Sequence, residues 1–122
     1  MKVGELRIGN WIWRPCCNDQ VVEILETGII GLDKLRGLMS FEELKPIPLT
    51  HELLLQCGFD EPCDGVYEHD EYNIELTHDY DNKWWVSWNG GEDFWFSIEN
   101  LHQLQNACQV ITGNELNIKC EL

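Results

Sequence analysis

The chain has 122 residues, and 22 acidic against 8 basic residues give it a net charge of -14. Residues 1–45 carry seven acids and six bases, a net charge of -1, whereas residues 46–122 carry fifteen acids and two bases, a net charge of -13. A hydrophobic content of 43% with six tryptophans excludes acidic disorder, because disordered chains lack the apolar groups that offset ordering entropy. No apolar run is long enough to cross a bilayer, and the polar first residues lack an export signal. We therefore expect a cytoplasmic protein without a membrane partner.

Residues 1–45 contain short segments rich in β-branched and aromatic residues, separated by turn residues. The segments have the length of strands and no helical period; they cover residues 11–14, 20–26, 29–33 and 38–45. They predict a small bent β-sheet or an SH3-like barrel. Pro46 and Pro48 fix φ and disfavour a helix before them, so we place a boundary there. The chain then divides into a β-rich N-terminal module, 1–45, and an acidic α+β module, 46–122.

The acidic module begins with a predicted helix and continues as an antiparallel meander. Thr50 is a suitable N-cap for a helix over residues 51–57, and Gly58 a suitable end. The acidic tract from Asp60 to Asp81 follows, with nine Asp or Glu and no Lys or Arg. Four strands are expected over residues 65–69, 72–78, 84–88 and 94–98, and residues 114–120 are a candidate for a last one.

The last predicted hairpin has apolar residues on one face of each strand. If Trp88 lies opposite Phe94, or Asn89 opposite Asp93, both apolar sets face one core. This register requires a hairpin loop with an odd number of residues. The same register leaves Trp85 and Trp95 on the opposite face. Either the N-terminal module covers that face, or the two indoles are exposed and mark a binding surface.

A second helix is predicted over residues 99–112, where apolar residues recur at helical spacing before Gly113. Its other faces carry histidine and amide residues, and no charge occurs between Glu99 and Glu115. Amides are buried at lower cost than carboxylates, because no ion is desolvated. This face is therefore either buried in a contact or a neutral, solvated surface.

Six cysteines occur at positions 16, 17, 57, 63, 108 and 120. Without an export signal we expect reduced thiols, because the cytosol keeps cysteines reduced. Cys16 and Cys17 are adjacent, five residues separate Cys57 from Cys63, and eleven separate Cys108 from Cys120. None of these spacings is a recognised pattern of zinc ligands. We therefore expect no structural metal and no cofactor.

Three sequence blocks of the chain, and the order in which they occur, resemble those of other proteins. They are Leu6 to Ile12, then Pro46 to Thr50 with Cys57-Gly58-Phe59 after it, and Leu101 to Asn106 running on to residues 112–116. Together they cover roughly a third of the chain, and they resemble a group of short, uncharacterised bacterial proteins often carried by phages and other mobile elements. The resemblance implies a phage or mobile-element origin. It carries over no activity and no functional residue.

The best candidate for chemistry is the set His69, Asp70, His78 and Asp79. Two histidines and carboxylates can hold a divalent cation whose bound water attacks a substrate, which gives a metal-dependent hydrolase as the alternative function. Convergence requires the strand to end near residue 78, because His78 and Asp79 otherwise point to opposite faces. The competing interpretation is a hydrated acidic rim with both histidines as partly buried polar residues. No nucleophile elbow or phosphate-binding loop occurs, so we expect no catalytic residue and no enzyme.

The charge distribution favours a non-catalytic protein-interaction module that binds a basic surface of a partner protein. In the more specific form of this hypothesis, the carboxylates imitate the phosphate backbone of a nucleic acid, and the module inhibits a nucleic-acid-binding protein. The competing interpretation is that the acidity only keeps the chain in solution. Direct nucleic-acid binding is disfavoured, because residues 46–82 contain no Lys or Arg. The sequence assigns no oligomeric state. The candidate partner-binding residues are Asp60, Glu61, Asp64, Asp70, Glu71, Asp79, Asp81, Trp85 and Trp95.

Overall fold

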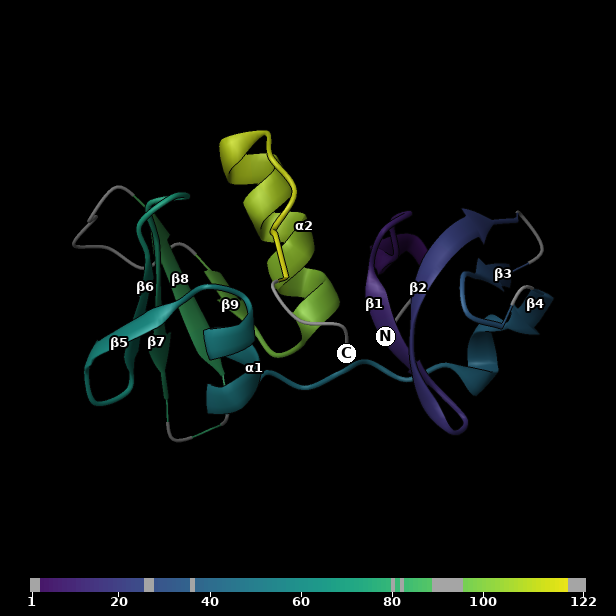
Figure 1. The fold of residues 1–122 in the computed structure, drawn as a ribbon, viewed down its shortest axis with the longest axis horizontal. Helices are drawn as coiled ribbons and strands as arrows, with labels where there is room; N and C mark the ends of the chain where they lie inside the picture. Colours follow the sequence, from purple (N-terminus) through teal and green to yellow (C-terminus); the bar gives the residue numbers. More distant parts are fainter. Residues whose placement is uncertain are drawn as a thin grey trace. The chain divides into compact units, whose positions relative to one another are not determined.

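A computed structural model of the chain describes residues 3–25, 28–35, 37–79, 81, 83–88 and 96–118. The described residues are mainly β-structure in two antiparallel sheets, of four and five strands (Figure 1). The expected α+β class is therefore confirmed only in coarse outline. Within this described part, neither α-helix has the length and apolar character needed to span a bilayer.

Two compact units divide the structure. The first holds the described residues up to Pro48 together with Asn100–Asn106, and the second holds Leu49–Glu99 and the described chain from Ala107 onward. Helix α2 (Leu101–Thr112) therefore contributes residues to both units.

The first unit is built on an open sheet with the strand order β1-β2-β3-β4. The strands are β1 (Trp11–Arg14), β2 (Cys17–Ile24), β3 (Ile29–Leu32) and β4 (Gly37–Ser40), with short 3₁₀ turns at Val3–Glu5 and Phe41–Glu43. The SH3-like barrel is wrong. Three of the four strands have only four residues. Strand β1 is joined to the chain that follows β4 by an isolated β-bridge between Trp13 and Lys45.

The core of the first unit lies on one face of this sheet. Alternate residues point to the same face, and the buried cluster contains Leu6, Ile12, Val21, Ile30, Leu32 and Leu44. Gly31 lies on the opposite face, where a Cβ atom would come within 2.9 Å of the Glu23 Cβ. The close approach of β2 and β3, next to a bulge between Val21 and Glu23, therefore requires glycine at this position.

A buried carboxylate organises the β1–β2 hairpin and the turn after β3. Asp19 has no exposed surface and accepts hydrogen bonds from the N–H groups of Gln20, Lys34 and Leu35 at 2.8–3.0 Å. Nε of Arg14 also donates to it, at 3.1 Å. Burial opposes the charged form, but these hydrogen bonds, led by Lys34 and Gln20, hold the pKa of Asp19 below its ordinary value. Arg14 is therefore held as the ion-pair partner of Asp19.

Two amide residues of α2, Gln105 and Asn106, form hydrogen bonds within the first unit. The amide of Gln105 accepts from the Trp11 N–H at 2.8 Å and donates to the Gly9 carbonyl at 3.1 Å. The Asn106 side chain donates to the Glu5 carbonyl at 2.7 Å and accepts from Arg7 at 3.1 Å. Of the two interpretations left open by the sequence, burial in a contact therefore holds for Gln105, with Asn106 partly buried in the same contact within the chain, whereas Gln103 and Gln109 are partly exposed.

The second unit contains a five-stranded meander in the order β5-β6-β7-β8-β9 (Figure 1). Its strands are β5 (Asp60–Cys63), β6 (Val66–His69), β7 (Ile74–His78), β8 (Trp84–Trp88) and β9 (Phe96–Ile98). Strand β5 was not predicted from the sequence. The candidate last strand is wrong for residues 114–118, which form no strand; residues 119–120 lie outside the described residues. Trp84 pairs with Ile98 and Val86 with Phe96, which places the two apolar sets on one face as predicted. Residues 89–95, including the loop, lie outside the described residues.

Helix α1 (His51–Gln56) starts and ends as its sequence predicts. The Thr50 side chain accepts the Leu53 N–H at 3.2 Å, and Gly58 follows the helix with a φ of 91°. Leu53 and Leu54 are its buried residues. Aromatic contacts strengthen the core of this unit, with ring centroids of Tyr67 and Trp84 at 5.3 Å and of Phe59 and His69 at 5.0 Å.

Candidate binding surface

Three carboxylates lie in line across neighbouring strands of the second sheet. Asp60 on β5 is paired with Glu68 on β6, and Glu68 with Glu75 on β7. Directly paired residues of an antiparallel sheet point to the same side, so all three carboxylates share one face. Tyr67 and Leu76, which alternate with them, are buried on the opposite face. We name Asp60, Glu68 and Glu75 the carboxylate row.

The strands that carry the row provide no positive charge to compensate it. Neighbouring strands lie about 4.8 Å apart, so successive charges of the row repeat at about that distance. Residues 46–82 contain no Lys or Arg. Like charges opposite one another destabilise a sheet. The row is therefore an energetic cost to the fold that no basic residue of β5, β6 or β7 offsets.

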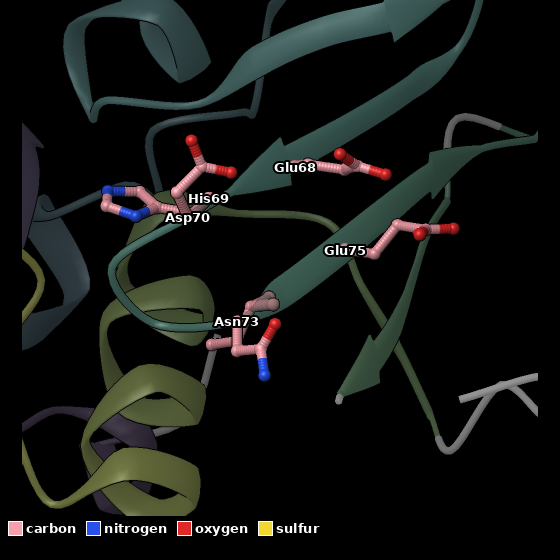
Figure 2. A pocket seen from close by; sticks show the side chains of 6 residues that line it. Glu68, His69, Asp70, Asn73 and Glu75 are labelled. Carbon is pink, nitrogen blue, oxygen red and sulfur yellow. The ribbon is translucent and has the colours of Figure 1, made fainter. Parts of the chain in front are cut away.

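The turn between β6 and β7 extends the acidic surface at one end. A shallow pocket of about 170 Å³ is lined by Glu68, His69, Asp70, Asn73, Ile74 and Glu75. Figure 2 shows Glu68 and Glu75 projecting to one side of their strands and the His69 ring to the other. Asp70 and Glu71 are exposed in the turn, which is closed by the Asn73 N–H donating to the His69 carbonyl at 2.8 Å. Two predicted binding residues thus flank the row at this end.

At the opposite end of the sheet, two of the predicted acids have partners within the chain. Asp79 accepts hydrogen bonds from the Asp81 N–H at 2.7 Å and from the indole N–H of Trp85 at 2.9 Å. These two bonds hold the pKa of Asp79 below its ordinary value. Glu61 accepts from the Gly65 N–H at 3.1 Å and lies 3.5 Å from Nδ1 of His51. Asp64 and Asp81 are exposed.

The histidine–aspartate set is not brought together by the fold. His69 pairs with Ile74 at one end of β7, and His78 lies four residues further along the same strand, roughly 13 Å away at ordinary strand rise. His69 is buried against Phe59 and Tyr72, and its Nε2 is 3.1 Å from the Cys57 carbonyl oxygen. His78 is exposed and stacks on Trp84 at 4.1 Å. Among the residues described, no three His, Cys, Asp or Glu side chains are grouped as metal ligands.

The outer face of β8 carries Trp85 and Ser87 as expected. Trp85 is half-buried and hydrogen-bonded to Asp79, and Ser87 is only 1% exposed. Ser87 pairs with Glu75, so it continues the carboxylate row onto the next strand as a neutral residue. Trp95, the other predicted anchor, lies outside the described residues.

Glu68 and Glu75 were not among the predicted residues, although the sequence contained part of a signal for them. Glu68 lies between the buried residues Tyr67 and His69, and Glu75 lies between the buried residues Ile74 and Leu76. A short turn after His69 places these two strands in register. Strand alternation places each glutamate on the outer face of its strand, but the predicted strand bounds, 65–69 and 72–78, put Glu68 opposite Asn73. The observed register is needed to oppose Glu68 to Glu75. The prediction instead relied on local charge density in the turns.

Comparison of the chain with protein-family models, curated proteins and solved structures finds no match in any of the three.

Proposed function

We propose that this chain is a non-catalytic interaction protein, whose second unit binds a basic surface of a partner protein through the carboxylate row. The observation that carries the proposal is the in-line placement of Asp60, Glu68 and Glu75 on one sheet face without a compensating base in these strands. A cationic partner relieves the repulsion within the row when it binds. Binding energy and relief of strain therefore act in the same direction.

The ordered placement of the row on a rigid sheet supports the more specific form of the proposal, in which the partner is a nucleic-acid-binding protein. The row and the phosphates of a DNA strand are both regular lines of negative charge, although their repeats differ, about 4.8 Å across the sheet against about 3.4 Å along the DNA axis. A groove lined with Lys and Arg for a phosphate backbone can thus accept the row as a rigid substitute. The chain itself binds no nucleic acid, because an acidic face repels phosphates.

The exposed turn residues Asp70 and Glu71 extend the same field beyond the row. Charges of one sign spread over a surface accelerate the encounter with an oppositely charged partner, and salt screens this attraction. The proposed function belongs to the cytoplasm and, following the resemblance in sequence, to a phage or mobile element that acts on its host.

The test is a comparison of two variants that lose the same charge at different places. The row variant is D60N/E68Q/E75Q, and the control variant is D33N/E42Q/E43Q, which neutralises three exposed acids of the first unit. Wild-type and variant chains are immobilised and exposed to a bacterial lysate. Bound proteins are eluted with increasing salt.

The proposal expects a partner that wild-type chain and control variant retain, that the row variant loses, and that salt elutes. If the partner binds DNA, added wild-type chain displaces that DNA. Equal retention by the row and control variants would show that binding follows net charge and not the row. Retention that persists at high salt would exclude an electrostatic interface.

A further inference from the structure

Two adjacent cysteines occupy the turn of the first hairpin. Arg14 on β1 is paired with Cys17 on β2, so Pro15 and Cys16 form a two-residue turn between them. Cys16 is exposed and Cys17 is partly exposed. Their Sγ atoms lie 3.8 Å apart, on the same side of the turn. The hairpin thus presents two thiols at its tip.

The backbone of Cys16 is in a conformation that favours glycine. Its φ is 98°, in the left-handed region that L-residues adopt at a cost. A turn that begins with proline ordinarily takes glycine or asparagine at the next position for this reason. A cysteine here is held in strain, and strained residues of this kind are concentrated at functional sites. The thiol, and not the turn geometry, explains the residue at this position.

A fixed positive charge lies beside the thiol pair. Nη1 of Arg14 is 3.2 Å from the Cys16 Sγ, and Nε of the same guanidinium is held 3.1 Å from the buried carboxylate of Asp19. Because Asp19 is itself held by three backbone N–H groups, the guanidinium cannot turn away freely. Reactive cysteines are found in such partly exposed surroundings beside a cation. Burial and the hydrogen bond with Cys16 nevertheless raise the pKa of Cys17, so the guanidinium positions the thiol pair and does not by itself activate it.

A direct disulfide between these two cysteines is disfavoured by chain geometry. Adjacent Cα atoms are about 3.8 Å apart across a trans peptide, whereas ordinary disulfides need at least about 4.4 Å. A single atom that bonds both sulfurs at about 2.3 Å, the zinc–sulfur bond length, holds them roughly 3.4–3.8 Å apart, depending on the angle. The observed separation of 3.8 Å therefore fits a bridging atom without movement of the backbone.

We propose that Cys16 and Cys17 form a vicinal dithiol site for a thiophilic trivalent metalloid, of the class of monosubstituted arsenicals. Such an arsenical needs only two sulfur ligands, whereas zinc needs four ligands. Two As–S bonds form and the arsenic–oxygen double bond breaks. The oxygen leaves as water with both thiol protons. Arsenic stays trivalent, so the step requires no oxidant or reductant.

The other described cysteines provide a contrast within the same chain. Cys57 and Cys108 are fully buried, and burial raises the pKa of each thiol to about 12. Cys63 is exposed on β5, in the second unit, and serves as the matched control.

The probe is phenylarsine oxide, titrated into folded, reduced protein and followed by native mass spectrometry. Wild type and C63S are expected to take one phenylarsenic group with loss of one water. C16G and C17S are expected to bind at least tenfold more weakly, because a single As–S bond remains. C16G removes the thiol while it relieves the backbone strain, so a more stable fold in urea shows that its loss of binding is not unfolding.

Undiminished binding by C16G or C17S would overturn the proposal, as would wild type that takes up no reagent before it unfolds. Loss of uptake in C63S would assign the site to Cys63 and overturn it equally.

Discussion

Replacement of Glu68 by lysine tests the energetics and the function of the carboxylate row together. Glu68 is the middle member, paired with Asp60 on one side and with Glu75 on the other. E68K converts two repulsive pairs into two attractive ones without a change on the core face of β6. The side chain is exposed, so the longer lysine meets no packing obstacle.

The expected gain in unfolding free energy follows from the magnitudes of cross-strand pairs. Each exposed pair is worth a few tenths of a kcal/mol. Removal of two repulsions and formation of two attractions therefore stabilise the second unit by about 1 kcal/mol at low salt. Screening reduces the gain, so it should fall to a small fraction at an ionic strength near 1 M, where the Debye length is about 3 Å.

The assay is urea unfolding of wild type and E68K at low and high salt, with E42K in the first unit as the control for net charge. Binding to the partner recovered by the pull-down is measured in parallel. We expect E68K to be more stable and to bind at least tenfold more weakly. Destabilisation, or a gain that is equal at both salt concentrations, would refute the view that Asp60, Glu68 and Glu75 repel one another.

Four further outcomes are expected. D19A should lower the unfolding free energy by about 3–5 kcal/mol in urea at pH 7, because it leaves Arg14 without its buried partner. Since the folded pKa of Asp19 is depressed, its contribution is complete above the unfolded pKa of about 3.9 and is lost as pH falls below it. The difference between wild type and D19A should thus shrink there, and a pH-independent difference would contradict the assignment. Q105L should cost about 1–3 kcal/mol, because the Trp11 N–H loses its partner, whereas the Gly9 carbonyl keeps the Gln20 side-chain amide; an unchanged urea midpoint would show that water replaces the Gln105 amide. C16G should stabilise the chain by about 0.5–1 kcal/mol, since relief of the left-handed strain exceeds the entropy cost of glycine; a loss of stability would argue against strain. All six thiols should react in denaturant after air-free purification under reducing conditions, and a lower count would contradict the expected reduced state.

Local signals in the sequence predicted the elements that local physics determines. Thr50 and Gly58 delimit α1 through hydrogen bonds and φ angles that depend on neighbouring residues alone. The alternation from Trp84 to Trp88 determined the buried face of β8 and the register with β9 in the same way. Strand β5 was missed because Asp60 to Cys63 lacks any apolar alternation and becomes a strand only by pairing with β6.

The candidate site was predicted less well, because its members are assembled by pairing between strands. The exposed acids of the turns, Asp70 and Glu71, were found by their density in the sequence. Asp79 was found too, but its bonds to Trp85 and to the Asp81 N–H depend on the path of the chain after β7. Pairwise register was needed to identify Glu68 and Glu75.

The contact between the amides of α2 and residues 5–11 has a consequence for synthesis of the chain on the ribosome. Gln105 lies 94 residues after Trp11, whose N–H it accepts. At about 5–20 residues per second, roughly 5–20 s pass between the appearance of these two residues. During that interval β1, an edge strand, has emerged without its partner amide, and its polar backbone is open to water and to neighbouring nascent chains. Residues 5–11 therefore complete their hydrogen bonds only after α2 has been made.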